Sequence, residues 1–430
     1  MNILIKNGRL IDPAQQIDGN FDVAIADGKV AWIGSGIPPK GDYEIIEAAG
    51  QIVAPGFIDL HTHLRQPGFE EKETIATGTR AAARGGFTTL CAMPNTNPAI
   101  DNRAIIDYVK FVASSEAVVR VLPIGCISKG RKGETLAELG EMAEAGVIGF
   151  SDDGSSVPNS RLLKQAMEYA AGLGLPVIEH CEDQSLADGG QVNEGIIATR
   201  LGLAGIPNAA EDIIVARDIA LAKLTGARLH ICHISTRGAV ELIRAAKADG
   251  VRVTAEVTPH HLTLTEDLCL GYDTNAKVNP PLRTLADIDA LIVGLLDGTL
   301  DSIATDHAPH TNNDKCCEFA LAPFGISGLE TALGSLMKLV HSGKIPLAIV
   351  IEKLTAAPAW IIGDKHGISG SLKVGDAADI VIFNPDTEWT VDTSKFASKG
   401  KNTPLSGQKL KGKVTATIYR GNTVYQEEIT

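Results

Sequence analysis

The sequence has little positive charge and no paired cysteine spacing. Its 39 Lys and Arg residues face 52 Asp and Glu residues, for a net charge of -13 at pH 7, which argues against nucleic acid or an anionic membrane as the main partner. Its seven cysteines lack the spacing of a disulfide framework or zinc ribbon, which favours a reducing compartment. It shows no secretory signal and no apolar run long enough to cross a bilayer. We therefore expect a cytoplasmic protein, in which an anionic substrate would need a dedicated arginine.

Both ends of the chain carry the pattern of short antiparallel strands. Residues 1–54 alternate polar and apolar side chains between glycine-containing turns, and residues 366–430 repeat this pattern. Neither segment can form a core alone, so we predict that they pack together as one small β-sandwich. With 430 residues, of which 44% are hydrophobic, the chain has room for this sandwich beside a large domain over residues 55–365.

The central segment alternates apolar runs with alanine-rich helical stretches, which predicts a parallel sheet. The candidate strands are residues 56–63, 85–93, 119–127, 146–153, 174–180, 227–235, 251–258 and 300–307. Eight strand-helix units predict a (β/α)8 barrel of the TIM type, an α/β fold whose active site lies at the carboxyl ends of the strands. An open doubly wound sheet is the alternative, but the turn after the first strand lacks the G-x-G-x-x-G motif that would support it.

Metal-binding residue types recur at the ends of five predicted strands: His61 and His63, Asp153, His180, His233 and Asp306. Alternate residues of a strand point to the same face, so the first two histidines would both project into the barrel mouth. Imidazole and carboxylate groups are zinc ligands. A lone histidine there is more often a structural residue, and a lone aspartate more often a helix cap. Five coincidences in one barrel instead favour one or two bound metal ions.

Specific sequence blocks surround these residues: PGFIDLHTHLRQPG, GGFTTLCAMPNTNP, GFSDDG, EHCED, HICHIST, EVTPHHL, KVNPPLR, ATDHAPH and APFGISGLET. Through these blocks the chain resembles the class I dihydroorotases of the amidohydrolase superfamily over nearly its whole length. Hydantoinases, dihydropyrimidinases and allantoinases are similar overall but place a carboxylated lysine on the fourth strand. The sequence GVIGFSDDG has no lysine there, and Asp153 matches the bridging aspartate of the class I enzymes.

The resemblance implies a role for each matching residue. One metal ion would be held by His61, His63 and Asp306, a second by His180 and His233, and Asp153 would touch both. The implied cofactor is Zn²⁺, as two ions or as one. The implied substrate-binding residues are His63, Arg65, Asn95, Asn279, His310, Phe324 and Gly325. One departure from the family is the Cys316-Cys317 pair in residues 311–323, a segment that could close over the substrate or form a plain surface loop.

The implied reaction is the reversible hydrolysis of the cyclic amide of (S)-dihydroorotate to N-carbamoyl-L-aspartate, in the de novo synthesis of pyrimidine nucleotides (UMP). An amide is a poor electrophile, so the site needs a water made nucleophilic at neutral pH, as zinc provides. Asp306 is the expected catalytic proton shuttle to the departing ring nitrogen. Arg65 can hold the substrate carboxylate through two parallel hydrogen bonds.

Two other functions stay open for this sequence. A hydantoinase or dihydropyrimidinase would act on neutral rings, and the absent lysine and present Arg65 weigh against it. A non-catalytic scaffold for aspartate carbamoyltransferase would be expected to lose metal ligands, and here every expected ligand is present. An active enzyme could still associate with that transferase, and we expect a homo-oligomer.

Overall fold

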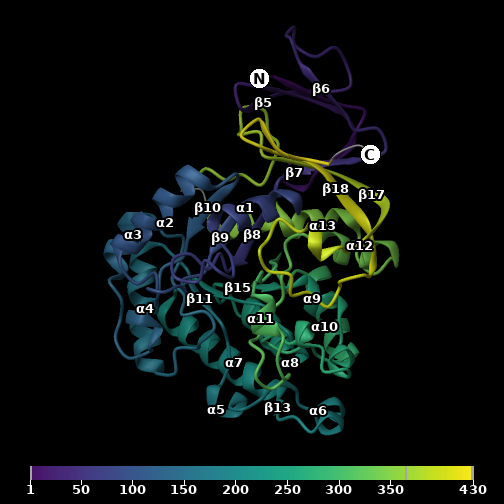
Figure 1. Ribbon diagram of the computed structural model, residues 1–430. Helices are drawn as coiled ribbons and strands as arrows, with labels where there is room; N and C mark the ends of the chain where they lie inside the picture. Colours follow the sequence, from purple (N-terminus) through teal and green to yellow (C-terminus); the bar gives the residue numbers. More distant parts are fainter. Residues whose placement is uncertain (1, 364–365, 428–430) are drawn as a thin grey trace.

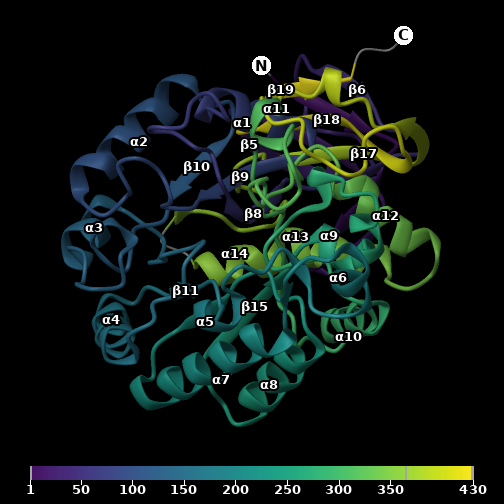
Figure 2. The same cartoon turned by 60° about the horizontal axis from the view of Figure 1, so that its bottom comes forward.

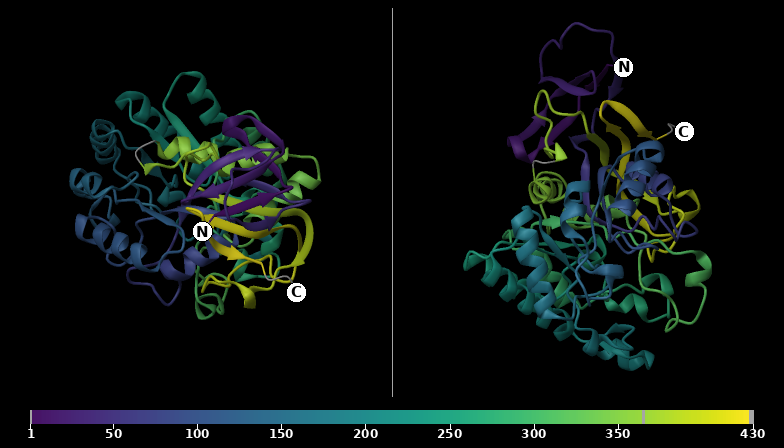
Figure 3. Two further views of the ribbon diagram at one scale, coloured as in Figure 1. Left: turned by 90° about the horizontal axis from the view of Figure 1, so that it is seen from above. Right: turned by 90° about the vertical axis from the view of Figure 1, so that its left-hand side faces the viewer.

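The two ends of the chain come together in one β-rich region. The computed structural model describes residues 2–363 and 366–427, and Figures 1 and 3 show the first and last strands side by side at one end of the molecule. A six-stranded sheet has the order β19-β18-β17-β7-β2-β3. Its strands are β2 (Arg9–Asp12), β3 (Ile17–Asn20), β7 (Ile52–Pro55), β17 (Ile380–Thr390), β18 (Lys409–Tyr419) and β19 (Asn422–Gln426).

A second, four-stranded sheet packs against the first. It has the order β5-β4-β1-β6 and consists of β1 (Ile3–Lys6), β4 (Asp22–Ala26), β5 (Lys29–Gly34) and β6 (Glu44–Glu47). One apolar cluster contains Ile5 and Val23 from this sheet together with Leu10, Ile380 and Ile418 from the other, all buried. The core of the β-rich region is therefore shared by residues from both ends of the chain.

The middle of the chain supplies parallel strands that pair in a closed circuit. In chain order they are β8 (Phe57–Thr62), β9 (Phe87–Ala92), β10 (Arg120–Pro123), β11 (Val177–Glu179), β14 (Leu229–Ile231), β15 (Val253–Val257) and β16 (Ser302–Ile303). Ladders join β8 to β9 to β10, and β11 to β14 to β15 to β16. Single parallel bridges complete the circuit, from Gly125 through Phe150 to Val177 and from His307 to Thr62.

The strand predicted over 146–153 is not a regular strand. Only Phe150 bridges both neighbours, while backbone hydrogen bonds to Gly125 on one side and Pro176 on the other still hold the segment in place. Glycines at 146 and 149 flank this short apolar run, and glycine weakens a regular strand. The short segment nevertheless positions the aspartates that follow it.

Helices surround these strands, as Figure 2 shows for α2, α3, α4, α7, α8 and α10. The predicted helical stretches correspond to α1 (Ile75–Arg84), α2 (Arg103–Glu116), α3 (Leu139–Ala145), α4 (Ser160–Leu173), α7 (Asn208–Thr225), α8 (Arg237–Ala248), α10 (Leu285–Leu296) and α12 (Ala332–His341). Side chains of Thr74, Asn102, Asn159, Thr236 and Thr284 accept hydrogen bonds from the first turns of five of them, which explains where these helices begin. The predicted α/β class is confirmed.

Shorter elements lie between these units. They are α5 (Gln184–Ala187), β12 (Val192–Asn193), α6 (Ile196–Leu201), β13 (Gly205–Ile206), α9 (Pro259–Thr263), α11 (Asn312–Lys315), α13 (Leu347–Leu354) and α14 (Ala356–Ile362). The predicted domain boundary at residue 365 lies outside the described residues. None of the helices in the described part of the chain has the length and apolar character needed to span a bilayer.

Candidate metal and substrate site

Six side chains from the ends of five strand segments converge in the interior of the strand circuit. Their ligand atoms form two groups, His61 with His63 and Asp306, and Asp153 with His180 and His233, within which all atoms lie less than 4.8 Å apart. Asp153 joins the groups, because its Oδ1 lies 3.3 Å from His61 Nε2 and 3.7 Å from His233 Nε2. All six predicted ligands are thus brought together in one buried place.

The backbone at this site is unusual for residues with side chains. His233 has a φ of 33°, Asp306 of 47° and Arg65 of 61°. Residues other than glycine rarely adopt the left-handed region, and such strain concentrates at functional sites. Three of the predicted site residues therefore adopt a left-handed backbone conformation, which costs free energy and sets the direction of their side chains.

The polar atoms at the centre of the site fit a metal ion. His61 Nε2 and Asp153 Oδ1 are buried and have no hydrogen-bond partner, although they lie 3.3 Å apart. Buried polar atoms without partners are costly, and a cation between them would satisfy both. Imidazole nitrogens with carboxylate oxygens, and no lysine, are a donor set that suits zinc.

Electrostatics keep the carboxylates of the site ionised. Burial raises the pKa of Asp306, but its interactions with His61 and with His63 outweigh this effect, so the pKa falls below its ordinary value. The pKa of Asp153 is likewise lowered, because His61 and His233 outweigh the effect of burial. Ionised carboxylates are the form that binds a metal ion.

A buried glutamate orients the His61 ring through its Nδ1 atom. Glu256 accepts at Oε1 from His61 Nδ1 over 2.8 Å and at Oε2 from His230 Nε2 over 3.1 Å. Burial raises the pKa of Glu256, yet the bonds to His230 and His61 lower it to about 2. The bond at Nδ1 leaves Nε2 of His61 free to bind a metal ion, as in carboxylate-histidine-metal arrangements. Sequence reasoning missed Glu256, although a glutamate inside the apolar strand VTAEV was a signal for it, and it left His230 unassigned.

Arg65 and His310 lie together beside the metal-binding groups. Arg65 Nε donates to the Pro309 carbonyl over 3.2 Å, and its Nη2 lies 3.5 Å from His310 Nε2. Burial lowers the pKa of Arg65 to about 10, so its guanidinium stays charged at neutral pH. Burial and the nearby charge of Arg65 lower the pKa of His310 to about 3, so it is neutral and donates to the Phe324 carbonyl over 2.9 Å.

The two predicted asparagines have different partners. Asn95 Oδ1 lies 2.8 Å from His63 Nδ1, so Asn95 orients one of the metal-binding histidines. Asn279 Nδ2 donates to Glu182 Oε2 over 2.7 Å, while its buried Oδ1 has no hydrogen-bond partner. Glu182, whose Oε1 lies 4.0 Å from His180 Nε2, links this asparagine to the second metal-binding group and was not anticipated.

Two buried cysteines lie beside proposed ligands in the chain. Cys232 lies within a group with His61 and Asp153. Cys181 Sγ instead donates to Asp218 Oδ2 over 3.4 Å. Burial raises the pKa of Cys232 well above its ordinary value, which favours the neutral thiol over the thiolate that binds metals.

The segment after His310 is held in place by the buried side chain of Lys315. Lys315 is buried, and its Nζ donates to the carbonyls of Thr274 over 3.0 Å and Pro323 over 2.7 Å. Cys316 and Cys317 are exposed free thiols. The middle of residues 311–323 is thus a surface turn held at both ends, and closure of this segment over a substrate stays a prediction.

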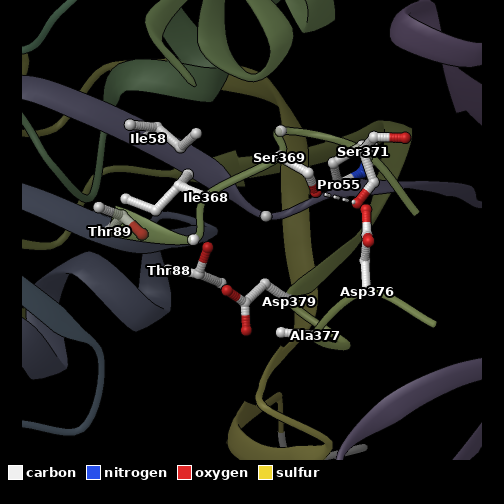
Figure 4. Close-up of a pocket in the computed structure, with 13 residues that line it drawn as sticks. Pro55, Ile58, Thr88, Thr89, Ile368, Ser369, Ser371, Asp376, Ala377 and Asp379 are labelled. Atoms are coloured by element: carbon white, nitrogen blue, oxygen red, sulfur yellow. Dashed lines mark hydrogen bonds between the residues drawn. The ribbon is translucent and has the colours of Figure 1, made fainter. Parts of the chain in front are cut away.

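A separate cavity of about 250 Å³ lies near the other ends of β8 and β9. Figure 4 shows Pro55, Ile58, Thr88 and Asp379 among its lining residues. It contains no histidine or cysteine and does not include the metal-binding groups.

Comparison with known proteins shows the family to which the chain belongs. A family model described as "Dihydro-orotase-like" matches residues 50–239, and one described as "Amidohydrolase family" matches residues 339–425. The dihydroorotase of Geobacter sp. (strain M21) is 53% identical over 426 residues, covering 99% of this chain and 100% of the relative. The dihydroorotase of Pelotomaculum thermopropionicum is 52% identical over 430 residues and covers 100% of both chains. The chain belongs to the dihydroorotase family of the amidohydrolases.

Solved structures similar to this dihydroorotase family member include cyclic amidases of other names. The L-hydantoinase (dihydropyrimidinase) from Arthrobacter aurescens superposes with a TM-score of 0.88 at 27% identity, covering 100% of this chain and 97% of that chain. The dihydropyrimidinase from Brevibacillus agri NCHU1002 has a TM-score of 0.85 at 26% identity, covering 99% and 95%. The fold is thus common to all of these proteins, and the substrate must be argued from the site.

Proposed function

We propose that the protein is a zinc-dependent dihydroorotase that interconverts (S)-dihydroorotate and N-carbamoyl-L-aspartate in pyrimidine synthesis. The observation that carries this proposal is the pairing of two features in one buried site. Six metal-binding side chains converge there, and the charged Arg65 and neutral His310 lie beside them. A cyclic amide that also bears a carboxylate is the substrate that needs both features.

We propose the barrel and the domain boundaries as the setting of this site. The closed circuit of parallel pairs supports a (β/α)8 barrel over residues 55–365. The shared apolar cluster of the two antiparallel sheets supports a β-sandwich built from residues 1–54 and 366–430. In such a barrel the carboxyl ends of the strands form the active site, which is where the six side chains lie.

The proposed metal ions are two Zn²⁺, one held by His61, His63 and Asp306 and one by His180 and His233, with Asp153 between them; a single ion is the alternative. When bound, zinc polarises the amide carbonyl and makes the attacking water nucleophilic at neutral pH. Asn95 and Glu256 fix the rings of His63 and His61 through their Nδ1 atoms. The resulting orientation leaves both Nε2 atoms facing the carboxylates.

Asp306 is the proposed proton shuttle. Both of its histidine contacts use Oδ1, at 3.0 Å from His63 and 3.5 Å from His61, which leaves Oδ2 to carry a proton. In the hydrolytic direction it takes a proton from the attacking water and gives it to the ring nitrogen as the amide bond breaks. In ring closure the same carboxylate removes a proton from the carbamoyl nitrogen.

The proposed substrate-binding residues orient the ring. Arg65 and His310, with Asn95, would hold the substrate carboxylate, and His63, Asn279 and the backbone of Phe324 and Gly325 would border the ring. The charge on Arg65 is available for a ligand, because Arg65 donates to the Pro309 carbonyl and forms no ion pair with a carboxylate in the described part of the chain. Binding of an anion to this buried guanidinium would recover part of the cost of burying it.

A hydantoinase-type activity on neutral rings is the second candidate, favoured only by the fold similarity to solved hydantoinases. Two observations weigh against it. Asp153 stands where those enzymes are expected to have a lysine, and two proteins named dihydroorotase are 53% and 52% identical to this chain over nearly its full length. A non-catalytic scaffold is disfavoured because all six ligand side chains are in place.

We propose further that the enzyme is cytoplasmic and homo-oligomeric, with association to aspartate carbamoyltransferase as an added possibility. All seven cysteines are free thiols, which fits a reducing compartment.

The test is a comparison of substrates on zinc-loaded protein, with metal content measured on the same sample. L-dihydroorotate, dihydrouracil, a hydantoin and allantoin are offered side by side. Selective turnover of dihydroorotate is the expected result. Turnover of the neutral rings alone would favour the hydantoinase candidate, and zinc-loaded protein inactive on all four would favour the scaffold.

A further inference from the structure

A connection of the β-rich region reaches into the substrate site. Residues 391–408, between β17 and β18, leave the six-stranded sheet and run along the end of the strand circuit. Ser398 Oγ and the backbone N–H of Lys399 donate to Glu73, which lies just before α1. Four residues later Asn402 is buried, with 3% of its surface exposed. This connection therefore touches the barrel segment where Arg65 and His310 lie.

The Asn402 amide uses all of its hydrogen-bonding capacity. Its Oδ1 accepts from the backbone N–H of His310 over 2.9 Å and from Ser327 Oγ over 2.8 Å. Its Nδ2 donates to the carbonyls of Ala308 and Gly325, each over 3.0 Å. An amide offers two donors and two acceptor positions, and all four are occupied. These four partners come from the two segments that carry the proposed substrate-binding residues.

Asn402 adds four hydrogen bonds to two segments that have little regular pairing with each other. A single parallel bridge joins His307 to Ile326, and the Ala308 N–H donates to the Ile326 carbonyl over 2.9 Å. Beyond this point the segments approach closely, since a side chain at Gly325, with a φ of 142°, would lie 2.7 Å from the Ala308 carbonyl. Here the Asn402 side chain lies between the two segments and hydrogen-bonds to both, where a regular strand pair would have backbone hydrogen bonds.

We propose that Asn402 is a positioning residue for recognition of the substrate carboxylate. It fixes the His310 backbone and the Phe324-Gly325 turn relative to Arg65, although it does not itself touch the substrate. This inference rests on the proposed function, because it assigns a role within the proposed dihydroorotate site. It also gives the β-rich region a part in substrate binding rather than in stability alone.

The consequence of losing the amide follows from its bonds. Asn402→Ala leaves one buried N–H and two buried carbonyls without partners, so both segments must shift to find new ones. A displaced His310 weakens binding of the carboxylate equally in the ground state and the transition state, which raises KM more than it lowers kcat. Asn402→Asp keeps the shape but loses both donors, and its charge would repel the substrate carboxylate as well.

The experiment measures kcat, KM and zinc content for wild type, Asn402→Ala, Asn402→Asp, His310→Ala and the double variant Asn402→Ala/His310→Ala. Asn422→Ala is the matched control, because the side chain of that exposed asparagine donates to the Arg420 carbonyl of its own turn, far along the chain from the proposed substrate-binding residues. We expect KM for dihydroorotate to rise about tenfold or more in Asn402→Ala, as loss of one well-placed hydrogen bond predicts. Zinc content, and kcat to within about threefold, should match those of the control.

The double variant separates a positioning role from a general loss of structure. If Asn402 acts through His310, removing both should raise KM little more than His310→Ala alone, because residues in one network are not additive. Losses that multiply, or an Asn402→Ala enzyme with the wild-type KM, would overturn the positioning role while leaving the proposed function intact. If Asn402→Ala does not fold, Asn402→Ser, which keeps one hydroxyl donor and acceptor and adds no charge, decides the question by the same KM comparison. A zinc-loaded wild type that is inactive on dihydroorotate would overturn the proposed function, and this inference with it.

Discussion

Replacing Glu256 should weaken zinc binding without touching any proposed ligand. Glu256 is fully buried, and its two oxygens bond His61 Nδ1 over 2.8 Å and His230 Nε2 over 3.1 Å. In Glu256→Gln the side chain keeps its shape, and its remaining oxygen can still accept from His61. The negative charge that makes the His61 ring a stronger ligand is lost. In Glu256→Ala both histidines lose their partner, and the His61 ring is free to turn.

The magnitude follows from these two bonds. A hydrogen bond to a charged group contributes about 1.5–3 kcal/mol, and partners behind metal-binding histidines typically change metal affinity about 10- to 100-fold. We expect about tenfold weaker zinc binding for Glu256→Gln, which loses the charge alone. For Glu256→Ala, which also loses the orientation of His61, we expect about hundredfold.

The assay is a competition for zinc with a chromophoric chelator at neutral pH. Glu241→Gln is the matched control, because Glu241 is exposed on α8 and is not among the proposed ligands or their hydrogen-bond partners. Unchanged zinc affinity in Glu256→Ala, in a protein that melts near the wild-type temperature, would refute the idea that this carboxylate supports the metal through His61.

Three further predictions concern the substrate, the proton and the stability of the fold. Arg65→Met should raise KM for dihydroorotate about 10- to 100-fold with unchanged zinc content, because a charge-assisted pair is lost; an unaltered KM would disprove the carboxylate role. Asp306→Asn should lower kcat about 10²- to 10⁴-fold while leaving metal largely bound, and steady-state kinetics with metal analysis would detect a variant that keeps its rate. Burial raises the pKa of Glu330 to about 7, despite hydrogen bonds from the Ala397 and Ser398 N–H groups. A raised pKa in the folded state stabilises the fold below the unfolded pKa, near 4.5, and this contribution disappears as pH rises to about 7. Wild type should therefore lose up to about 3 kcal/mol relative to Glu330→Gln across that window, and parallel urea titration curves of the two proteins at pH 4.5 and 7.5 would contradict this.

Much of the fold could be predicted because its signals are local. Alternation at both ends of the chain and the order of strands and helices between them required no long-range information, and the helix starts followed from side chains such as Thr74 and Asn102. The fourth segment differed because Gly146 and Gly149 leave too little regular strand around Phe150. Its pairing depends on backbone groups of the neighbouring segments, at Gly125 and Pro176, and the local sequence pattern gives no information about them.

Site residues could be predicted where a metal-binding residue type stands at the end of a predicted strand, as His61 and His233 do. The supporting residues were not, because their partners are distant in the chain. Glu256 lies 195 residues from His61, and Asn402 lies 92 residues from His310. Neither is a metal ligand or follows a recognised spacing, so only the folded arrangement reveals what each one holds.

The mixed origin of the six-stranded sheet has a consequence for synthesis of the chain on the ribosome. Strand β7 ends at Pro55, yet its partner β17 begins only at Ile380. At about 5–20 residues per second, the first strands must wait for tens of seconds with one edge unpaired. Unpaired strand edges invite association with other chains. A ribosome that stalls before Ile380 would therefore release a product that holds every proposed metal ligand but exposes this edge, and such a product should depend on chaperones to avoid aggregation.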